Sequence, residues 1–328
     1  MLLEIILLLA GLGLIIKGGD LFVAASVRIA EFLHMPRVVI GSTLVSLATT
    51  TPELVVSIMA GAKGESGLAV GNAVGSCICN LGLILGVTAA LKQIDVHPRV
   101  LRTPLIAMFG FGVLLFILTF NLTLSRGNGL MLLLLGLGYF IYDFQHHLRA
   151  AKPREVKEAE IVHEEVVERF RWLKTRTGTA AQFFGAAGIV VLGSKLLVDA
   201  AVNIAGALGI PSIVIGLTVV AVGTSLPELI TAITSSRQNV SDLAVGNVLG
   251  ANIANLSLIV GTAAVIHEVT MSRATQVFNF PALLITMGLA LFMILSGKRV
   301  TRREGATLLV FYSLYIVALI GMTLATRN

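Results

Sequence analysis

Two short stretches of the chain read Ala48-Thr49-Thr50-Thr51-Pro52-Glu53 and Gly223-Thr224-Ser225-Leu226-Pro227-Glu228, and each lies in the middle of an apolar run. Proline removes a backbone donor and clashes with the carbonyl one turn earlier, so a helix through either stretch should break and leave free carbonyl oxygens. The glutamate that follows then places a carboxylate at mid-membrane depth, where charge is costly and usually marks an ion or substrate pathway. Hydroxyls, carbonyls and carboxylates together form an all-oxygen ligand set, which suits a hard cation such as Ca²⁺.

The composition indicates an integral membrane protein. The chain has 328 residues, of which 56% are hydrophobic and 13% charged, and its mean hydropathy is +0.91. Its apolar runs repeatedly exceed the roughly 18 residues that cross a bilayer. The net charge of +6 would favour nucleic-acid binding in a soluble chain, but here the basic residues lie between apolar runs, which argues against such a partner. Cys77 and Cys79 lie inside one apolar run and are expected to be small buried residues.

The two stretches belong to a longer internal repeat. An offset of 175 residues aligns Glu53 with Glu228, and an ungapped comparison of residues 36–86 with 211–261 gives 24 identities in 51 positions. Similarity at that level indicates a duplicated unit. The apolar first sixteen residues have a counterpart in the second unit, so they are expected to belong to the fold and not to a signal peptide.

Each unit contains five predicted membrane spans. They cover 2–33 (interrupted near Lys17 to Asp20), 37–62, 67–90, 101–120 and 128–148, and then 179–208, 212–236, 242–265, 277–297 and 305–325. An odd number of crossings inverts the second unit relative to the first, as is common in secondary transporters whose site lies at the midplane between the halves. The predicted fold class is an all-α polytopic membrane protein of ten transmembrane helices in two inverted five-helix repeats. The expected division is 1–148 for the first repeat, 149–178 for a charged linker and 179–328 for the second repeat.

The basic residues predict the orientation. With the N-terminus outside, 18 Lys and Arg residues fall on the inner side and four on the outer side. The positive-inside rule then places both termini outside and the linker in the cytoplasm of a multi-pass cell-membrane protein, or inner-membrane protein in a Gram-negative cell. The linker is predicted to be a charged interfacial helix, with a regulatory or partner-binding helix as the alternative. Asp143, near the end of the fifth span, is expected to be solvated, and the histidines fall at span ends or in loops.

A second polar segment follows each glutamate, at Ala69 to Asn80 and at Ala244 to Asn255. Three polar or small residues in each segment are four apart and share a helical face: Asn72, Ser76 and Asn80 in the first, and Asn247, Ala251 and Asn255 in the second. Buried asparagines in membranes can simply bridge helices, and that interpretation stays open. The occurrence of both segments beside a proline and a glutamate, twice, favours a role in ion binding.

The motifs Thr-x-x-Pro-Glu and Gly-Asn-x-x-Gly-(Ser/Ala)-x-Ile-x-Asn, each present twice, resemble the α-repeats of the cation/calcium exchanger superfamily, and most closely its prokaryotic sodium/calcium exchanger branch. The resemblance covers nearly the whole chain. It implies a ten-helix antiporter that exchanges Ca²⁺ for Na⁺ by alternating access, works as a monomer, and is neither an enzyme nor dependent on a cofactor. The ion ligands that it implies are Glu53, Glu228, Thr49 and Thr224, with the backbone oxygens of Ser46 and Ala221 and the hydroxyls of Thr50, Ser225 and Ser76 at flanking Na⁺ sites.

The sequence departs from the family pattern at several of these positions. The first copy reads Ala-Thr-Thr-Thr where the family usually has Gly-Thr-Ser-Leu, Cys77 stands where an asparagine is usual, and Ala251 lacks the hydroxyl of Ser76. Related exchangers often carry an aspartate at one of the positions matching Asn80 and Asn255, whereas both are amides here. These two amides can offer oxygens but no charge, which leaves two carboxylates and an open Na⁺ count.

Two facing carboxylates in a poorly solvated site repel each other, so an empty and fully ionised site is unfavourable. One Ca²⁺, two Na⁺ or two protons would cancel the charge. An empty carrier should therefore resist passing through its occluded state, which is a physical route to obligatory exchange. A proton/Ca²⁺ exchanger, a K⁺-dependent Na⁺/Ca²⁺ exchanger and, less favoured, a cation channel remain alternatives. The sequence holds no His-Glu-x-x-His or Gly-x-Ser-x-Gly motif that would favour a hydrolase.

Overall fold

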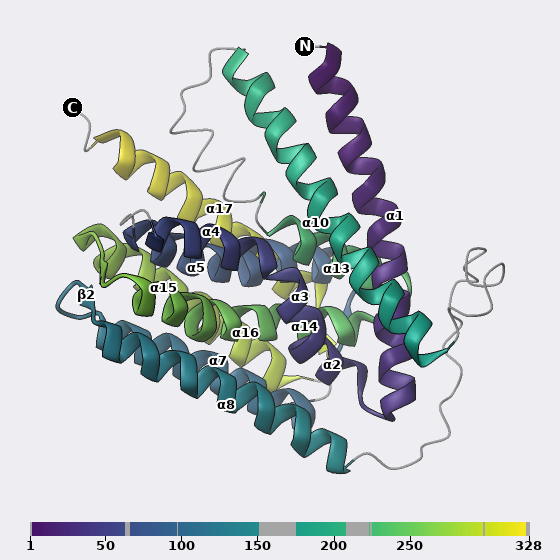
Figure 1. The fold of residues 1–328 in the computed structure, drawn as a ribbon. Helices are drawn as coiled ribbons and strands as arrows, with labels where there is room; N and C mark the ends of the chain where they lie inside the picture. Colours follow the sequence, from purple (N-terminus) through teal and green to yellow (C-terminus); the bar gives the residue numbers. More distant parts are fainter. Residues whose placement is uncertain are drawn as a thin grey trace.

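The computed structural model describes residues 2–62, 66–96, 98–150, 175–207, 223, 225–297 and 299–325. This part of the chain is nearly all helical (Figure 1). Eight of its helices are long and apolar enough to cross a membrane, with mean hydropathy between 1.3 and 2.1, and a ninth candidate is a pair of helices bent by 42°. The protein is therefore a polytopic helical membrane protein.

The first half comprises α1 (Leu2–Leu33); the bent span α2 (Arg37–Ile40), η1 (Gly41–Val45), α3 (Ser46–Thr49) and α4 (Thr51–Ala62); α5 (Ser66–Cys79), η2 (Asn80–Leu85) and α6 (Gly86–Leu91); β1 (Ile94–Asp95); α7 (Pro98–Leu118); β2 (Thr123–Leu124); and α8 (Arg126–Ala150). The η elements are π-helical turns, which insert one extra residue into a helix without ending it. Five predicted spans coincide with these helices to within three residues.

The second half comprises α10 (Arg176–Ala207); α13 (Leu226–Arg237); α14 (Ser241–Ala254), η5 (Asn255–Ile259) and α15 (Val260–Ile266); β3 (Val269–Thr270); η6 (Thr275–Asn279) and α16 (Phe280–Ser296); β4 (Arg299–Val300); and α17 (Arg302–Ala325). Four of the five predicted spans again match to within three residues. The span predicted over 212–236 is described only at Gly223 and from Ser225 onward. Most of the predicted linker lies outside the described residues.

The first predicted span was expected to be interrupted near Lys17 to Asp20, and this expectation is wrong because α1 runs without a break. The two glycines in that stretch serve close helix packing instead. A Cβ added at Gly18 would come within 2.8 Å of the Ile189 side chain, and one added at Gly19 within 2.6 Å of the Ile230 side chain. Small residues allow membrane helices to approach in this way, so α1 packs tightly against α10 and α13.

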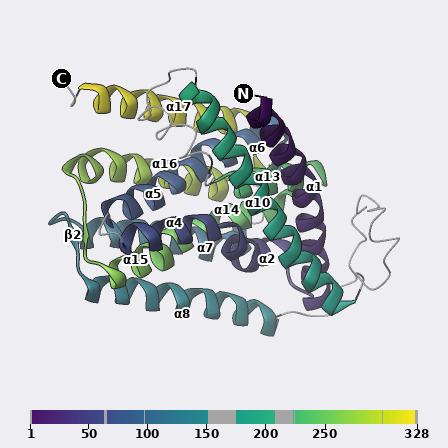
Figure 2. The ribbon, with the colours of Figure 1, turned by 45° about the horizontal axis from the view of Figure 1, so that its top comes forward.

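The two polar segments form the most buried of the long helices that the structure describes. In the span Ser241–Ile266, 78% of the apolar window is buried, and in Ala69–Leu91 the share is 72%, against 22–44% for the other long spans. In contrast, α1 and α10 lie side by side along one flank of the bundle in both views (Figures 1 and 2). The polar side chains are therefore enclosed by protein on nearly all sides, away from lipid.

Two short antiparallel sheets link the halves. In one sheet β1 pairs with β4, with Ile94 opposite Val300, and in the other β2 pairs with β3, with Leu124 opposite Val269. The 175-residue offset relates β1 to β3, and it relates β2 to β4 to within one residue. Helix α7 separates β1 from β2 along the chain, so the two sheets lie at opposite ends of a membrane-spanning helix.

Candidate cation-binding site

A backbone break was predicted beside both Pro-Glu pairs; it is present at Thr50 in the first copy, and in the second copy α13 begins at Leu226, directly before Pro227. Thr50 has φ −79° and ψ 6° between α3 and α4, and Ser225 has φ −91° and ψ 10° at the start of α13. These two residues occupy matching positions of the repeat and share one conformation. Each break is followed by a new helix whose first turn contains the proline and the glutamate, so both carboxylates lie near a helix N-terminus.

The Ser46 carbonyl oxygen, one turn before the first break, is not left free. The Ser46 carbonyl accepts hydrogen bonds from the Thr50 backbone N–H at 3.0 Å, from the Thr50 hydroxyl at 2.8 Å and from the Thr49 hydroxyl at 3.3 Å. The expectation of a free carbonyl is therefore wrong at Ser46, because this oxygen keeps its helical donor, the Thr50 N–H, and gains two hydroxyl donors. The carbonyl that loses a helical donor to Pro52 is that of Ala48, four residues earlier. A cation bound to this oxygen would require the two hydroxyls to turn away from it.

The two glutamates face each other across the interface between the halves. Both Glu53 and Glu228 are completely buried, and their carboxylates lie close enough to interact electrostatically. The Ser225 hydroxyl donates to Glu53 Oε1 at 3.4 Å, and the Thr49 hydroxyl lies beside Glu228. Each carboxylate therefore has a hydroxyl neighbour from the opposite half, which makes the arrangement crosswise.

Several buried oxygens around the glutamates have no hydrogen-bond partner in the described part of the chain. They are Glu53 Oε2, both carboxylate oxygens of Glu228, Ser76 Oγ, Asn80 Oδ1 and Asn255 Oδ1. Buried polar atoms are nearly always paired, and an unpaired one costs about 1–3 kcal/mol, more for a charged group. Ca²⁺ takes six to eight oxygen ligands, so a bound cation could satisfy this set.

The two polar segments change from α-helix to π-helix at matching residues. In the first half the π-helical segment begins at Asn80, and in the second it begins at Asn255. Such turns occur frequently at functional sites, because the extra residue re-aims the side chains around it. No residue type in either segment signals a π-helical turn, so these turns could not be predicted from the sequence.

Asparagine amides of the second polar segment hold two side chains of the first half. Asn80 Nδ2 donates to Asn252 Oδ1 at 3.0 Å, which leaves Asn80 Oδ1 without a partner. The Thr49 hydroxyl lies 3.1 Å from Asn247 Oδ1, so its single hydrogen is shared between this oxygen and the Ser46 carbonyl. Asn252 was not singled out from the sequence, although the offset aligns it with Cys77, where the family usually has an asparagine. That alignment was the available signal.

The structure describes only some of the remaining predicted positions. Thr224 and Ala221 lie outside the described residues. Cys77 and Cys79 are free and buried, as predicted. Among the described residues no group of three or more His, Cys, Asp or Glu side chains could hold a metal ion, so a cation here would depend on neutral oxygens in addition to the two glutamates.

Comparison with known proteins agrees with this architecture. The chain matches the sodium/calcium exchanger protein family over residues 3–144 and 179–321, and it belongs to that family. It is thus a membrane transporter of the exchanger type and not an enzyme. It is 31% identical to the sodium/calcium exchanger MaX1 of Methanosarcina acetivorans, over 96% of this chain and 97% of the relative, and 35% identical to the inner membrane protein YrbG of Escherichia coli, over 81% of each. Its fold is similar to a solved structure of the sodium-calcium exchanger NCX_Mj, with a TM-score of 0.82, 28% identity, and coverage of 97% and 99% of the two chains.

Proposed function

We propose that this protein is a secondary active antiporter that exchanges Ca²⁺ for Na⁺, with the two ions bound in turn between Glu53 and Glu228. The observation that carries the proposal is the pair of completely buried carboxylates, one from each half, whose oxygens are mostly unpaired. The names of the relative MaX1 and of the solved structure NCX_Mj support the choice of ions. Ca²⁺ and Na⁺ are then substrates, and no cofactor takes part.

The charge of the site explains why exchange is obligatory. Two buried carboxylates without counter-ions repel each other and are poorly solvated, so the empty site resists closing. One Ca²⁺ neutralises the pair. Thr49 and Thr224 would complete its shell, while Thr50, Ser225, Ser76 and the backbone oxygens of Ser46 and Ala221 would hold Na⁺ at flanking positions. Asn80 and Asn255 would supply neutral oxygens to an ion or to a bound water.

The proposed architecture is ten spans in two inverted repeats, 1–148 and 179–328, joined by a cytoplasmic linker. The two sheets between the halves support this architecture. The 175-residue offset relates the strands of one sheet to the strands of the other, and the membrane-spanning helix α7 connects the two sheets, so they lie on opposite sides of the membrane. Both termini then lie outside, and a single chain contains the whole site. Cysteines placed at Asn121 and Arg303, both on the exposed surface, test the orientation. A membrane-impermeant thiol reagent should label position 121 from outside and position 303 only from inside; labelling of both from one side would contradict the inversion.

The Na⁺ count follows from the same charges. Three Na⁺ leave the two-carboxylate site at about +1, whereas Ca²⁺ leaves it near zero, so an exchange of three Na⁺ for one Ca²⁺ moves net charge across the membrane. We propose this count because most of the oxygens at the flanking sites are retained. Uptake driven by a clamped Na⁺ gradient should then respond to an imposed membrane potential. Indifference to the potential would show an electroneutral exchange of two for one.

Radioactive Ca²⁺ uptake into proteoliposomes tests the function as a whole. Vesicles loaded with Na⁺ and diluted into Na⁺-free buffer should accumulate Ca²⁺, and vesicles with only a K⁺ or a proton gradient should not. Uptake that a pH gradient drives without Na⁺ would establish a proton/Ca²⁺ exchanger, and an absolute need for K⁺ would establish the K⁺-dependent type. Uptake that needs no counter-ion would identify a channel.

A further inference from the structure

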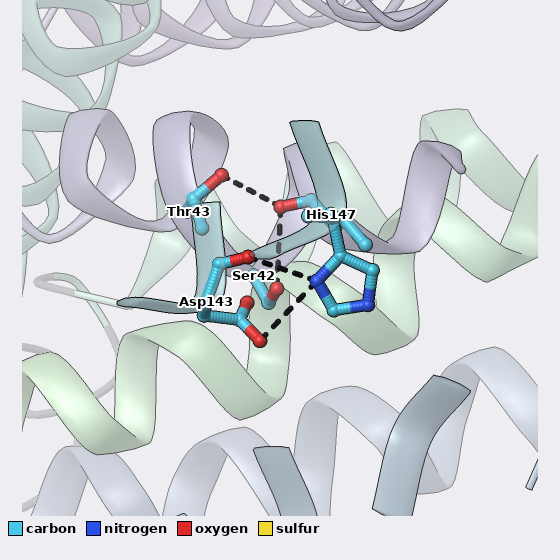
Figure 3. A network of polar contacts seen from close by, with 5 residues as sticks. Ser42, Thr43, Asp143 and His147 are labelled. Atoms are coloured by element: carbon cyan, nitrogen blue, oxygen red, sulfur yellow. Dashed lines mark hydrogen bonds and ion pairs between the residues drawn. The ribbon is translucent and has the colours of Figure 1, made fainter. Parts of the chain in front are cut away.

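Asp143 was expected to be a solvated residue at the end of a span, and this expectation is wrong. Its side chain is only 1% exposed, and neither carboxylate oxygen has a hydrogen-bond partner in the described part of the chain. It lies on α8 where that helix packs against α2 and η1, with the hydroxyl of Ser42 facing its carboxylate (Figure 3). A buried carboxylate with no partner needs a proton or a positive neighbour.

His147, one turn further along α8, is the side chain that can provide the positive charge. Its Nδ1 lies 2.9 Å from the Asp143 backbone carbonyl and 3.6 Å from Asp143 Oδ1 (Figure 3). Both of these oxygens are acceptors, so Nδ1 carries a hydrogen, and Nε2 is the nitrogen that gains or loses a proton. The His147 side chain is 18% exposed, so the imidazole reaches the surface while the carboxylate remains covered.

The other groups around Asp143 compensate its charge less than His147 does; among them, His146 attracts the carboxylate more weakly and packs edge-on against the His147 ring. On its own helix, Tyr139 lies one turn earlier, and His146 is exposed and stacks on Tyr142. The packed segments η1, η5 and α15 contain no titratable residue, and α2 contributes only Arg37, which lines a separate pocket with Asp95 and Asp242. Helix α7 lines a groove with α8 and carries its arginines, Arg99 and Arg102, in its first turns.

We propose that Asp143 and His147 form a proton-binding site separate from the glutamate site. A proton from water adds to His147 Nε2, so the charge of the pair changes from −1 to 0, and release returns the proton to water. No other bond is made or broken. The second half lacks this pair, because the helix starts Arg126 and Arg302 are 176 residues apart, which places Leu319 and Thr323 at the matching positions. The site is therefore one-sided and, in the orientation proposed above, faces the cytoplasm.

Binding of a proton to this site can affect the exchange site through Ser42. The Ser42 hydroxyl donates to the Val39 carbonyl at 3.2 Å, a long bond that an uncompensated Asp143 carboxylate can replace. Ser42 lies one turn before Ser46, and its carbonyl packs so closely on α14 that a Cβ added at Gly250 would lie 2.2 Å from it. After loss of the proton, a hydrogen bond from Ser42 to Asp143 links η1 to α8 and restrains the segment that carries Thr49 and Glu53. This regulatory step rests on the proposed exchange function, whereas the proton site itself does not.

Infrared difference spectroscopy tests the proton site without any transport. In a Glu53→Gln/Glu228→Gln background, a step in pH should produce carboxylate and imidazole difference bands. The band of the Asp143 carboxylate should be lost in Asp143→Asn, should no longer respond to the pH step in His147→Gln, and should be kept in His146→Gln, the control on the same turn. Size-exclusion profiles and melting temperatures show whether each variant is folded, and Ser42→Ala, which leaves both titrating groups in place, should keep the bands with altered frequency. Identical spectra in all folded variants would overturn the site.

Exchange measured in oriented proteoliposomes tests the regulation. With the pH on the opposite side and both ion gradients clamped, raising the pH on the side of α8's C-terminal end from about 6 to about 8.5 should slow wild-type exchange roughly threefold. Asp143→Asn and His147→Gln should flatten that response, while His146→Gln should keep it. A response unchanged in Asp143→Asn would overturn the regulatory role. If the protein exchanged no Na⁺ for Ca²⁺ at all, the infrared result would still decide on the proton site.

Discussion

The two polar segments of the repeat share a backbone but not a hydrogen-bond network. Both become π-helical at an asparagine, Asn80 or Asn255. Asn80 is held by an amide hydrogen bond from its own Nδ2 to Asn252, whereas the Asn255 amide makes no such bond among the described residues and lies beside the thiol of Cys77, the residue that matches Asn252 in the first half. The two halves thus share the path of the backbone, whereas the amide that orients an asparagine of the site is present in the second half and absent from the first.

A second difference reinforces the first. Ser76 brings a hydroxyl next to Glu53, whereas Ala251 at the matching position of the second half has none, so the hydroxyl beside Glu228 in the described residues is that of Thr49 from the first half. A cation bound between the glutamates draws on both halves equally, but Na⁺ bound to one side or the other meets different neutral ligands. We therefore expect the two halves to contribute equally to Ca²⁺ binding and unequally to Na⁺ binding.

Removal of either carboxylate should have the largest effect. Glu53→Gln and Glu228→Gln each keep the size of the side chain but lower the charge of the pair from −2 to −1, too little to balance a dehydrated divalent ion. Each should reduce Ca²⁺ transport by about 100-fold or more, since breaking a buried charge interaction costs roughly 3–5 kcal/mol. Transport rates of the two purified variants, both folded by size-exclusion chromatography, should be equally low. Near-normal transport by one of them would show that the halves are not equivalent for Ca²⁺.

A larger residue at the close contact between the halves should have the second-largest effect, on the stability of the protein. A Cβ at Gly250 would lie 2.2 Å from the Ser42 carbonyl and 2.5 Å from Ser46 Oγ, so Gly250→Ala should destabilise the protein by about 1–3 kcal/mol through overpacking. Gly75 is its counterpart, and inverted halves would turn it toward residues 217–221, outside the described part. The melting temperature in detergent should fall to a similar extent in Gly75→Ala. A Gly75→Ala variant as stable as the wild type would show that the halves pack differently.

The hydrogen bond between Asn80 and Asn252, which has no counterpart among the described residues of the other half, should affect the apparent affinity for Na⁺. Asn252→Ala frees the Asn80 amide and leaves its Nδ2 unpaired, a loss of about 1 kcal/mol or more, so the apparent Na⁺ affinity should fall roughly five- to tenfold. Cys77→Ala, the matched change in the first half, removes no amide and should alter that affinity by less than about twofold. The measurement is Ca²⁺ uptake as a function of Na⁺ concentration. Equal effects of the two changes would remove the asymmetry.

A carboxylate introduced at Asn80 or at Asn255 should have the smallest effect, and the effect should differ between the two halves. Asn80→Asp replaces a donor with an acceptor opposite Asn252 Oδ1, so it should weaken exchange about threefold unless it is protonated. Asn255→Asp meets no such acceptor and should mainly add a titratable group, making the Na⁺ dependence sensitive to pH. Na⁺ titrations at two pH values compare them. An Asn255→Asp profile identical to the wild type at both would exclude Asn255 from the vicinity of the ions.

Much of the fold could be predicted because its signals are local. Nine of the ten predicted spans match helices in the described residues, since long apolar runs leave few alternatives, and the break at Thr50 follows from the chemistry of Pro52. The continuity of α1 could not be predicted, because its glycines are explained only by the helices packed on them. Composition alone does not distinguish a glycine that breaks a helix from one that accommodates a neighbour.

The site was predictable to the extent that each half carries its own motif. Glu53, Glu228, Ser225 and Thr49 lie together as expected from the repeat. The role of Asn252 and the burial of Asp143 were missed, because both depend on which helix faces which, and that is set by long-range packing. The hydroxyls that occupy the Ser46 carbonyl were missed for a different reason: the hydrogen bonds are local, but the sequence does not fix the rotamers that make them.

The central claim is that one carboxylate from each half binds the same Ca²⁺, and equilibrium binding of radioactive Ca²⁺ to the purified protein tests it most directly. The wild type should bind one Ca²⁺ per chain, and increasing Na⁺ should displace it with a steeper than simple dependence, because several Na⁺ replace one Ca²⁺. Glu53→Gln and Glu228→Gln should each lose this binding, by about 100-fold or more in affinity. Two Ca²⁺ per chain, each lost in only one of the variants, would show that the glutamates belong to separate sites and would contradict the account.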